Sequence, residues 1–324
     1  MIPHYVVFVH GIGDECKGFN RGLLRRSEDA FTKTVVGLIS ERPLRDSITF
    51  REALWSDITQ QDQNELWDRL FPTMKGKSAG WIEILAKPTN WVARLKYWSA
   101  LRRLVVNYQG DLIAYFESPE AHKYSYIHDR VWSVICDIAR DAESRGAAAG
   151  NKASLTIAAH SLGAVIASDL IYDMHNNKNG KSWPQPIQLA NLITFGSPLA
   201  LYNLRYGFGP TAFRAPVRIQ HPYGCWINLY DPQDVIGYPL KPLNPAYDQA
   251  VFADKEINVG QWWRFWSWAL RISPFSHLLY WKDRRVSRMI GRKAALDWLL
   301  TNQPQLEPTL KDEYEKYGAW VRRL

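Results

Sequence analysis

Ser161 is the residue whose surroundings best suit nucleophilic chemistry. It follows the apolar run 154–159 and precedes a stretch of small and apolar residues that can form a helix. A serine held in a sharp turn between a strand and a helix needs small residues two positions before and after it, because the two elements approach closely there. Ala159 and Gly163 occupy these positions. The pattern predicts that the Ser161 hydroxyl lies at the end of a strand.

A glycine-containing segment follows the first apolar run, 5–9. Its residues are His10, Gly11, Ile12 and Gly13. Glycines in such a turn allow backbone N–H groups to face an anion, either a phosphate or the oxyanion that forms when a serine attacks a carbonyl. The third glycine of a dinucleotide-binding fingerprint would fall at Cys16, so a nucleotide site is disfavoured.

Together, the serine turn and the glycine segment resemble the lipase and esterase branch of the α/β-hydrolase superfamily, in which nucleophile, acid and histidine follow in that order. Segment 191–198, which ends in Phe-Gly-Ser-Pro, is similar to the strand and turn after the nucleophile in many lipases. The resemblance implies an oxyanion hole made by the backbone N–H groups of Ile12 and Leu162, where one donor contributes about 3 kcal/mol. It covers residues 5–54 and about 125–300, through short motifs.

Two aspartates compete for the role of the catalytic acid. Both follow the predicted strand 225–230, where the family carries its carboxylate. Asp231 lies directly before a proline, which is typical of a turn-forming residue. The family pattern has an apolar pair and then a proline after the acid, and such a pair and Pro239 follow Asp234. The resemblance therefore favours Asp234.

The resemblance also selects the base. Of the eight histidines, only His277 lies beyond the acid and the last apparent strand. Segment 276–281 resembles the histidine loop of the family, which opens the final helix. We expect His10 and His160 to shape the turns beside the catalytic groups and, with Gly11, to contribute to substrate binding.

These assignments define a covalent mechanism for an ester hydrolase. An imidazole takes the serine proton during attack, and a buried carboxylate holds that imidazole in the useful tautomer. Ser161 would form an acyl-enzyme, which water activated by His277 would hydrolyse. No metal or organic cofactor is needed. Acyl transfer or thioester hydrolysis by the same triad, and a catalytically silent lipid-binding module, are the alternatives.

Short apolar runs that alternate with helical stretches would position these residues. The alternation indicates an α/β fold, a mostly parallel sheet flanked by helices, and the resemblance implies the α/β-hydrolase fold. The predicted strands are 5–9, 48–54, 154–159, 188–195, 225–230 and 256–259. Two helical faces should pack on this sheet, one formed by Ile127, Val131, Val134, Ile135 and Ile138, the other begun by Val286, Met289 and Ile290.

We interpret residues 1–324 as a single domain with an insertion. Residues 60–124 interrupt the alternation, because one crossover between strands needs far fewer residues. This stretch is predicted to be an inserted helical cap. Residues 302–324 form a charged C-terminal tail, which we expect to be a helix packed on the body rather than a protruding partner contact.

Aromatic residues suggest the kind of substrate. The chain has 15 tryptophans, and the dense aromatic segment 261–268 lies just before His277. We expect its Trp262, Trp263 and Trp266 to bind substrate, by lining an acyl-chain pocket or forming a flap. The alternative is a helix packed under the cap. An ester with an apolar acyl group, such as a lipid, is the expected substrate.

Composition limits partners and location. Forty Lys and Arg against 32 Asp and Glu give a formal charge of +8, which favours an anionic partner. Interleaved tryptophans and cations are compatible with peripheral contact with an anionic membrane, whereas a nucleic-acid partner is not expected. The three cysteines lack metal-ligand spacing. With neither a signal peptide nor a transmembrane segment evident, we expect a cytoplasmic protein.

Overall fold

The computed structural model describes residues 1–11, 20–70, 123–206, 217–259 and 276–324. The chain divides into two compact units. The first comprises Met1–Gly11, Lys17–Ala53 and Val131–Leu324, and the second comprises Ile12–Cys16 and Leu54–Arg130. Ser161, Asp234 and His277 all belong to the first unit.

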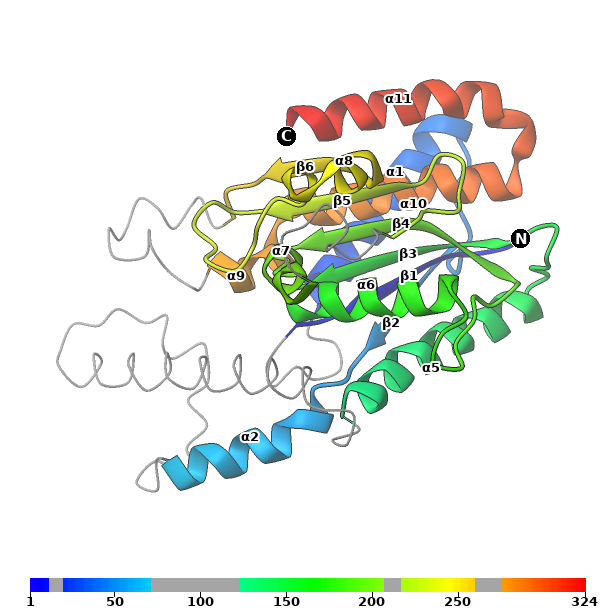
Figure 1. The fold of residues 1–324 in the computed structure, drawn as a ribbon. Coiled ribbons are helices and arrows are strands. Elements are labelled where there is room, and N and C mark those ends of the chain that lie inside the picture. Colours follow the sequence, from blue (N-terminus) through cyan, green and yellow to red (C-terminus); the bar gives the residue numbers. More distant parts are fainter. Residues whose placement is uncertain (12–19, 71–122, 207–216, 260–275) are drawn as a thin grey trace. The chain divides into compact units, whose positions relative to one another are not determined.

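A six-stranded parallel sheet forms the centre of the first unit (Figure 1). Its strands are β1 (His4–Val9), β2 (Ile48–Ala53), β3 (Ala153–His160), β4 (Ile187–Phe195), β5 (Cys225–Tyr230) and β6 (Val251–Glu256). Their order in the sheet is β2-β1-β3-β4-β5-β6. Strands β1 and β3 are buried along their whole length, which explains the continuous apolar run of β1 and the mainly apolar sequence of β3. The predicted α/β architecture with a mostly parallel sheet is confirmed.

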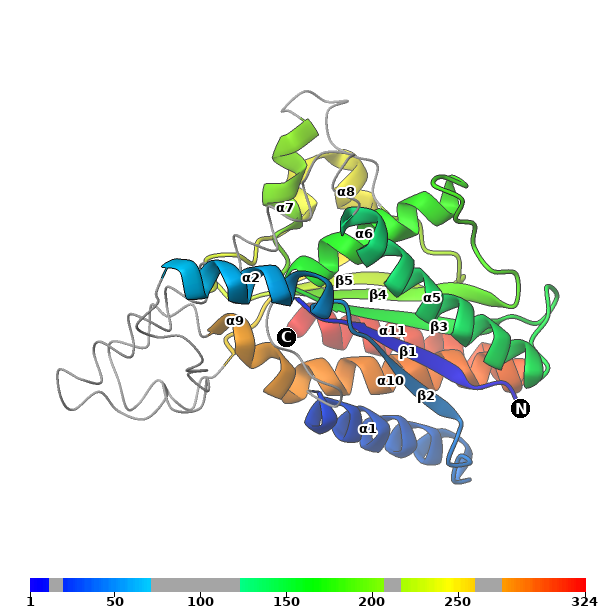
Figure 2. The ribbon, with the colours of Figure 1, turned by 90° about the horizontal axis from the view of Figure 1, so that it is seen from below.

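Helices cover both faces of this sheet (Figure 2). On one face lie α1 (Arg21–Ile39), α10 (Arg284–Asn302) and α11 (Glu307–Arg323). On the other lie α6 (Leu162–His175) and the part of α5 (Lys123–Ser144) that belongs to the first unit. Shorter helices are α7 (Leu199–Tyr202), α8 (Pro245–Ala250) and α9 (Ser276–Leu279), with 3₁₀ turns at Asn203–Tyr206, Lys241–Leu243, Tyr280–Lys282 and Pro304–Leu306.

The last strand differs from the prediction. We predicted it at 256–259, whereas β6 spans Val251–Glu256 and pairs with β5. Strand β6 lies at the edge of the sheet, and only Val251 and Ala253 of its six residues are buried, so its apolar first half is followed by three charged residues. The apolar residues Ile257 and Val259 lie just after the strand and are buried.

In the second unit, helix α2 (Asp57–Leu70) is tied to the first turns of α5. Arg130 donates to both carboxylate oxygens of Asp57, at 3.1 to 3.3 Å, and to the Leu54 carbonyl at 3.2 Å. Most of the predicted cap, residues 71–122, lies outside the described residues. Across the described ranges, no helix has both the length and the apolarity needed to cross a membrane.

Helices α1 and α10 pack unusually closely. A Cβ atom at Gly291 would lie 2.2 Å from the Ser27 carbonyl oxygen and 2.8 Å from Ala30 Cβ, so only glycine allows this approach. Phe31 and Trp298 meet edge to face nearby, with ring centroids 5.8 Å apart. Because both helices also contact the sheet, this pair forms the core of that layer.

The C-terminal segment 302–324 includes α11, which packs on the body. Its buried residues Leu310, Tyr314, Tyr317 and Val321 belong to the same hydrophobic core as β6 and α10. Their spacing of three or four residues places them on one side of the helix.

Charged groups are also buried between α10, α11 and the sheet. Lys293 Nζ lies 2.5 Å from Asp297 Oδ1, and neither side chain is more than 1% exposed. Tyr314 and Asn191 donate to the same carboxylate at 2.9 and 2.7 Å. Although burial acts in the opposite direction, Lys293 and nearby histidines lower the pKa of Asp297 to about 2. These hydrogen bonds and the ion pair join β4 to α10 and α11.

We predict that the buried residue His4 makes stability fall in mild acid. Burial lowers the pKa of His4 from 6.5 to about 3. Between these values the unfolded chain binds a proton that the folded protein does not, so the free energy of unfolding decreases by about 1.4 kcal/mol per pH unit. Urea unfolding of the wild type and His4→Gln between pH 6 and pH 4 tests this.

The free energy of unfolding of the variant should depend less steeply on pH. The difference in slope should correspond to at most one bound proton. It should not become flat, because burial also lowers the pKa values of His160 and His221. Glutamine preserves a polar group near Thr156 Oγ1, which lies 2.8 Å from His4 Nε2. Equal slopes for the two proteins would contradict the prediction.

Candidate active site

Ser161 lies in a strained turn between β3 and α6. Its φ of 55° and ψ of −132° are unfavourable for a residue with a Cβ atom, at a cost of about 1–3 kcal/mol. The Ser161 N–H donates to the Phe195 carbonyl of β4 at 3.1 Å, and Ser161 O accepts from Ala164 N–H at 2.9 Å. Backbone bonds on both sides therefore hold the strained residue in place.

Two glycines make room for this turn. A Cβ atom at Gly163 would lie 2.3 Å from His10 O and 2.4 Å from Val9 O, which explains why a small residue is needed two positions after the serine. A Cβ atom at Gly11 would lie 2.4 Å from Ser161 Cβ. The end of β1 and the start of α6 thus enclose Ser161 from two sides.

The structure brings together the three predicted catalytic side chains. His277, in α9, places Nε2 2.7 Å from Ser161 Oγ and Nδ1 2.9 Å from Asp234 Oδ2. All three residues are buried. When Nδ1–H donates to Asp234, Nε2 accepts the hydroxyl proton of Ser161. A serine with this partner can act as a nucleophile.

Asp234 and Asp231 have different partners. Asp234 Oδ1 accepts from Ile236 N–H at 3.0 Å, while Oδ2 faces His277. Burial opposes its ionisation, but His277 and the hydrogen bonds outweigh this and lower the pKa of Asp234. Asp231 instead accepts from the N–H groups of Gln233 at 2.9 Å and Val259 at 2.7 Å. It stabilises the loop that carries Asp234.

Tyr280 is a positioning residue that the sequence reasoning missed. Its hydroxyl accepts from Asp231 N–H at 2.7 Å and donates to Asp234 Oδ2 at 3.0 Å. Burial and Asp234 raise the pKa of Tyr280, so it remains a neutral donor. Tyr280 lies three residues after His277, and this helical spacing was the signal that could have revealed it.

Gly196 lets the acid, the base and Tyr280 come together. It has a φ of 56°, and a Cβ atom there would lie 2.9 Å from the Tyr280 ring, 3.0 Å from Asp234 Oδ2 and 3.1 Å from His277 Nδ1. The glycine of the Phe-Gly-Ser-Pro segment is therefore required by the site itself.

His160 lies behind His277. It is 3% exposed, and its Nε2–H donates to the His277 carbonyl at 2.7 Å. Burial, together with His277, lowers the pKa of His160 well below 6.5, so the ring is a neutral donor. Its ring centroid lies 4.6 Å from that of His277 and 5.4 Å from that of Trp281. In this position His160 orients His277.

Of the other residues predicted at the site, the structure also describes His10 and Leu162. His10 is buried, and its Nδ1–H donates to Gly11 O at 2.8 Å. Leu162 is the first residue of α6, where a backbone N–H has no acceptor within the helix and the helix dipole favours negative charge. Its N–H is therefore suited to an oxyanion. Ile12, Trp262, Trp263 and Trp266 lie outside the described residues.

No family model matches the chain, and no curated protein matches it significantly. Within the part of the chain that the structure describes, no group of three or more His, Cys, Asp or Glu side chains is arranged to hold a metal ion.

We predict that Ser161→Gly is more stable than Ser161→Ala, by roughly 0.5–2 kcal/mol. Both variants lose the bond to His277, but only glycine also removes the strain of the positive φ. Ser168 in α6 provides the matched control, because a helix interior should favour Ser168→Ala over Ser168→Gly by about 1 kcal/mol. Urea unfolding of the four variants measures both differences. If the alanine variant is more stable than the glycine variant at position 161 as well as at position 168, the prediction that Ser161 is strained is wrong.

We also predict that Tyr280→Phe slows reaction of Ser161 with a fluorophosphonate by about tenfold or more, because a hydrogen bond to a charged group is worth about 1.5–3 kcal/mol. Tyr317→Phe is the control, since that hydroxyl donates to Met289 O at 3.2 Å within the helical layer. The second-order rate constant of labelling measures the effect. Equal rate constants for the two variants would show that Tyr280 does not position Asp234.

Proposed function

We propose that this protein is a serine hydrolase that cleaves carboxylic esters through an acyl-enzyme on Ser161. The observation that carries the proposal is the continuous hydrogen-bonded chain from Ser161 Oγ through both ring nitrogens of His277 to Asp234 Oδ2. Three buried side chains from distant parts of the sequence form this chain. Its connectivity is that of a nucleophile, a general base and the acid that orients the base.

The surrounding fold supports the same proposal. Ser161 follows the central strand β3. Strands β1 and β2, which precede β3 in the sequence, lie on one side of it in the sheet, and β4, β5 and β6, which follow it, lie on the other. Ligands of open parallel sheets bind where the strand order reverses in this way, outside the carboxyl ends of the strands. In Figure 1, α9, which carries His277, lies at this edge of the sheet. We propose the α/β-hydrolase fold for this arrangement.

The proposed reaction has two steps. Ser161 Oγ attacks the ester carbonyl carbon while His277 Nε2 takes the hydroxyl proton, and the alcohol leaves with that proton. A water molecule then gives a proton to the same nitrogen and attacks the acyl-enzyme, releasing the acid and restoring Ser161. Asp234 holds Nδ1–H of His277 and stabilises the imidazolium in both steps.

The start of α6 provides electrostatic support for these steps. The N–H of Leu162 and the positive end of the helix dipole lie beside Ser161, where the carbonyl oxygen becomes negative. We propose the N–H of Ile12 as the second donor and an apolar acyl group as the preferred substrate, both on the basis of the sequence.

A fluorophosphonate probe tests the proposal. The wild type should be labelled and Ser161→Ala should not, because the probe reacts with an activated serine. Ser197→Ala is the matched control: this serine also follows a strand and is buried, but its Oγ accepts from Leu199 N–H at 3.3 Å and belongs to a turn. The control should retain labelling.

Turnover of p-nitrophenyl esters of increasing acyl length then tests the reaction. Ser161→Ala should lower kcat by a factor on the order of 10⁴–10⁶. The acyl length with the highest kcat/KM identifies the preferred substrate class. If the folded wild type neither reacts with the probe nor hydrolyses any ester, with and without added lipid, the proposal is wrong.

A further inference from the structure

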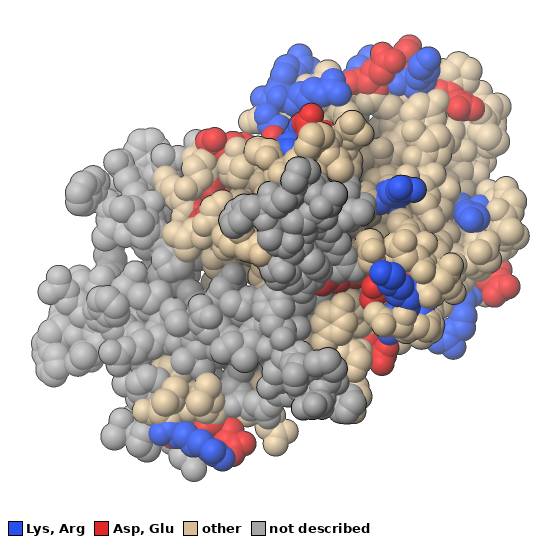
Figure 3. Space-filling view, viewed as in Figure 1, with Lys and Arg blue, Asp and Glu red and all other residues tan. Residues whose placement is uncertain are grey.

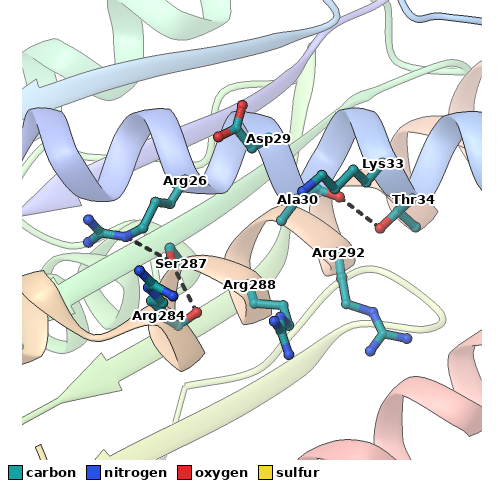
Figure 4. Close-up of a pocket in the computed structure, with 9 residues that line it drawn as sticks. All are labelled: Arg26, Asp29, Ala30, Lys33, Thr34, Arg284, Ser287, Arg288 and Arg292. Atoms are coloured by element: carbon teal, nitrogen blue, oxygen red, sulfur yellow. Dashed lines mark hydrogen bonds between the residues drawn. The ribbon is translucent and has the colours of Figure 1, made fainter.

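A basic cavity of about 500 Å³ lies between α1 and α10 (Figure 4). This volume is within the range of ligand sites in proteins. Five cationic side chains line it: Arg26 and Lys33 of α1, and Arg284, Arg288 and Arg292 of α10. We call this set of residues the basic groove.

The spacing of the arginines creates the concentration of charge. Arg284, Arg288 and Arg292 follow one another at intervals of four residues, so they form a row along one side of α10. Eight residues at a rise of about 1.5 Å give this row a length of about 12 Å. The close contact of α1 and α10 at Gly291 brings Arg26 and Lys33 next to the row.

The cations of the basic groove lack ion-pair partners among the described residues. None of the five cations forms an ion pair with a carboxylate in the described parts of the chain. Asp29 is the single acidic residue among those that line the cavity, and its side chain points away from the arginines of α10 in Figure 4. Like charges four residues apart cost a helix about 0.2–0.5 kcal/mol per pair, so this row destabilises the free protein.

Other cations nearby do have acidic partners. Arg285 and Lys293 belong to the same helix but face elsewhere, and they pair with Asp283 and Asp297 respectively. On the face shown in Figure 3, basic and acidic side chains alternate where α11 runs, and Lys316 pairs with Glu313. Among the cations of α10, those without an acidic partner in the described residues are therefore the three that line the groove.

Two of the guanidinium groups are held in fixed positions. Arg26 donates to Trp281 O at 3.0 Å and to Ser287 Oγ at 3.4 Å. Arg292 stacks on the Trp320 ring at 4.9 Å from its centroid. Burial and the neighbouring Arg284 lower the pKa of Arg26, and Asp283 offsets this only in part. These groups therefore lose little freedom when an anion binds.

We propose that the basic groove binds a ligand that carries at least two phosphate groups. A guanidinium matches two oxygens of a phosphate, and the row of arginines is long enough for two such groups. The Ser287 hydroxyl already donates to the Arg284 carbonyl, and the Thr34 hydroxyl to the Ala30 carbonyl. The charged side chains must therefore bind the phosphates. The ligand is a soluble polyphosphate or the headgroup of a multiply phosphorylated lipid.

The proposal is separate from the proposed hydrolase reaction. The basic groove lies between two helices of the layer that covers one face of the sheet, and Ser161 and Asp234 do not line it. Binding can therefore be measured on the intact chain without any assay of ester hydrolysis, and the two proposals can fail independently.

The test compares two double variants that remove the same charge. Arg284→Gln/Arg288→Gln changes the basic groove, whereas Arg42→Gln/Arg45→Gln changes exposed residues after α1 that do not line it. Calorimetric titration with inorganic tripolyphosphate at 0.15 M salt should show saturable binding to the wild type. We expect the groove variant to bind about tenfold more weakly or worse, and the control variant to bind like the wild type.

Vesicle sedimentation identifies the source of the phosphates. Vesicles that contain phosphatidylinositol bisphosphate are compared with phosphatidylserine vesicles of equal charge. Groove-dependent sedimentation with the former supports a lipid headgroup, and groove-dependent tripolyphosphate binding without sedimentation supports a soluble ligand. The proposal is overturned if neither probe binds, or if both double variants weaken binding equally.

Thermal melting separates binding from folding. Because Arg284 and Arg288 repel each other, the groove variant should melt at the wild-type temperature or above it. Tripolyphosphate should raise the melting temperature of the wild type and control but not of the groove variant. A groove variant that melts at a lower temperature and is still stabilised by tripolyphosphate would show that these arginines serve the fold and not the ligand.

Discussion

The positive φ of Ser161 is the constraint on which the rest of the site depends. L-residues avoid this conformation, and it persists because the surrounding backbone fixes it. The bond from Ser161 N–H to Phe195 O ties it to β4, and the lack of side chains at Gly11 and Gly163 lets β1 and α6 close around it. The same turn that strains the residue directs its hydroxyl toward His277.

Two neutral donors behind the proposed catalytic groups hold the base and the acid. His160 donates to the carbonyl of His277, and Tyr280 donates to the carboxylate of Asp234. Burial keeps His160 uncharged and Tyr280 protonated, so neither adds a second charge to a buried pair. Since a buried charge is costly unless it is paired, neutral donors stabilise the acid and base at lower cost than ions would.

The sequence predicts those parts of the molecule that local chemistry determines. A buried parallel strand such as β1 has a continuous apolar run, and the turn at Ser161 needs small neighbours, so both patterns are visible in the chain. Asp234 was favoured over Asp231 because an apolar pair and a proline follow it, as in the family that the sequence resembles, whereas a proline follows Asp231 directly. Tyr280 was missed because its role depends on a contact with a residue 46 positions away. Strand β6 was misplaced because an edge strand does not need an apolar run.

Helix α10 shows how one element can serve stability and recognition with the same residue types. Toward the sheet and α11 it buries Lys293 with Asp297, where an unpaired charge would be strongly destabilising. At the basic groove it exposes Arg284 and Arg288, where water reduces the cost of leaving a charge unpaired. The depth of each position therefore decides whether its cation needs a partner within the chain. Cations that remain unpaired at an indentation in the surface are the ones available to an external anion.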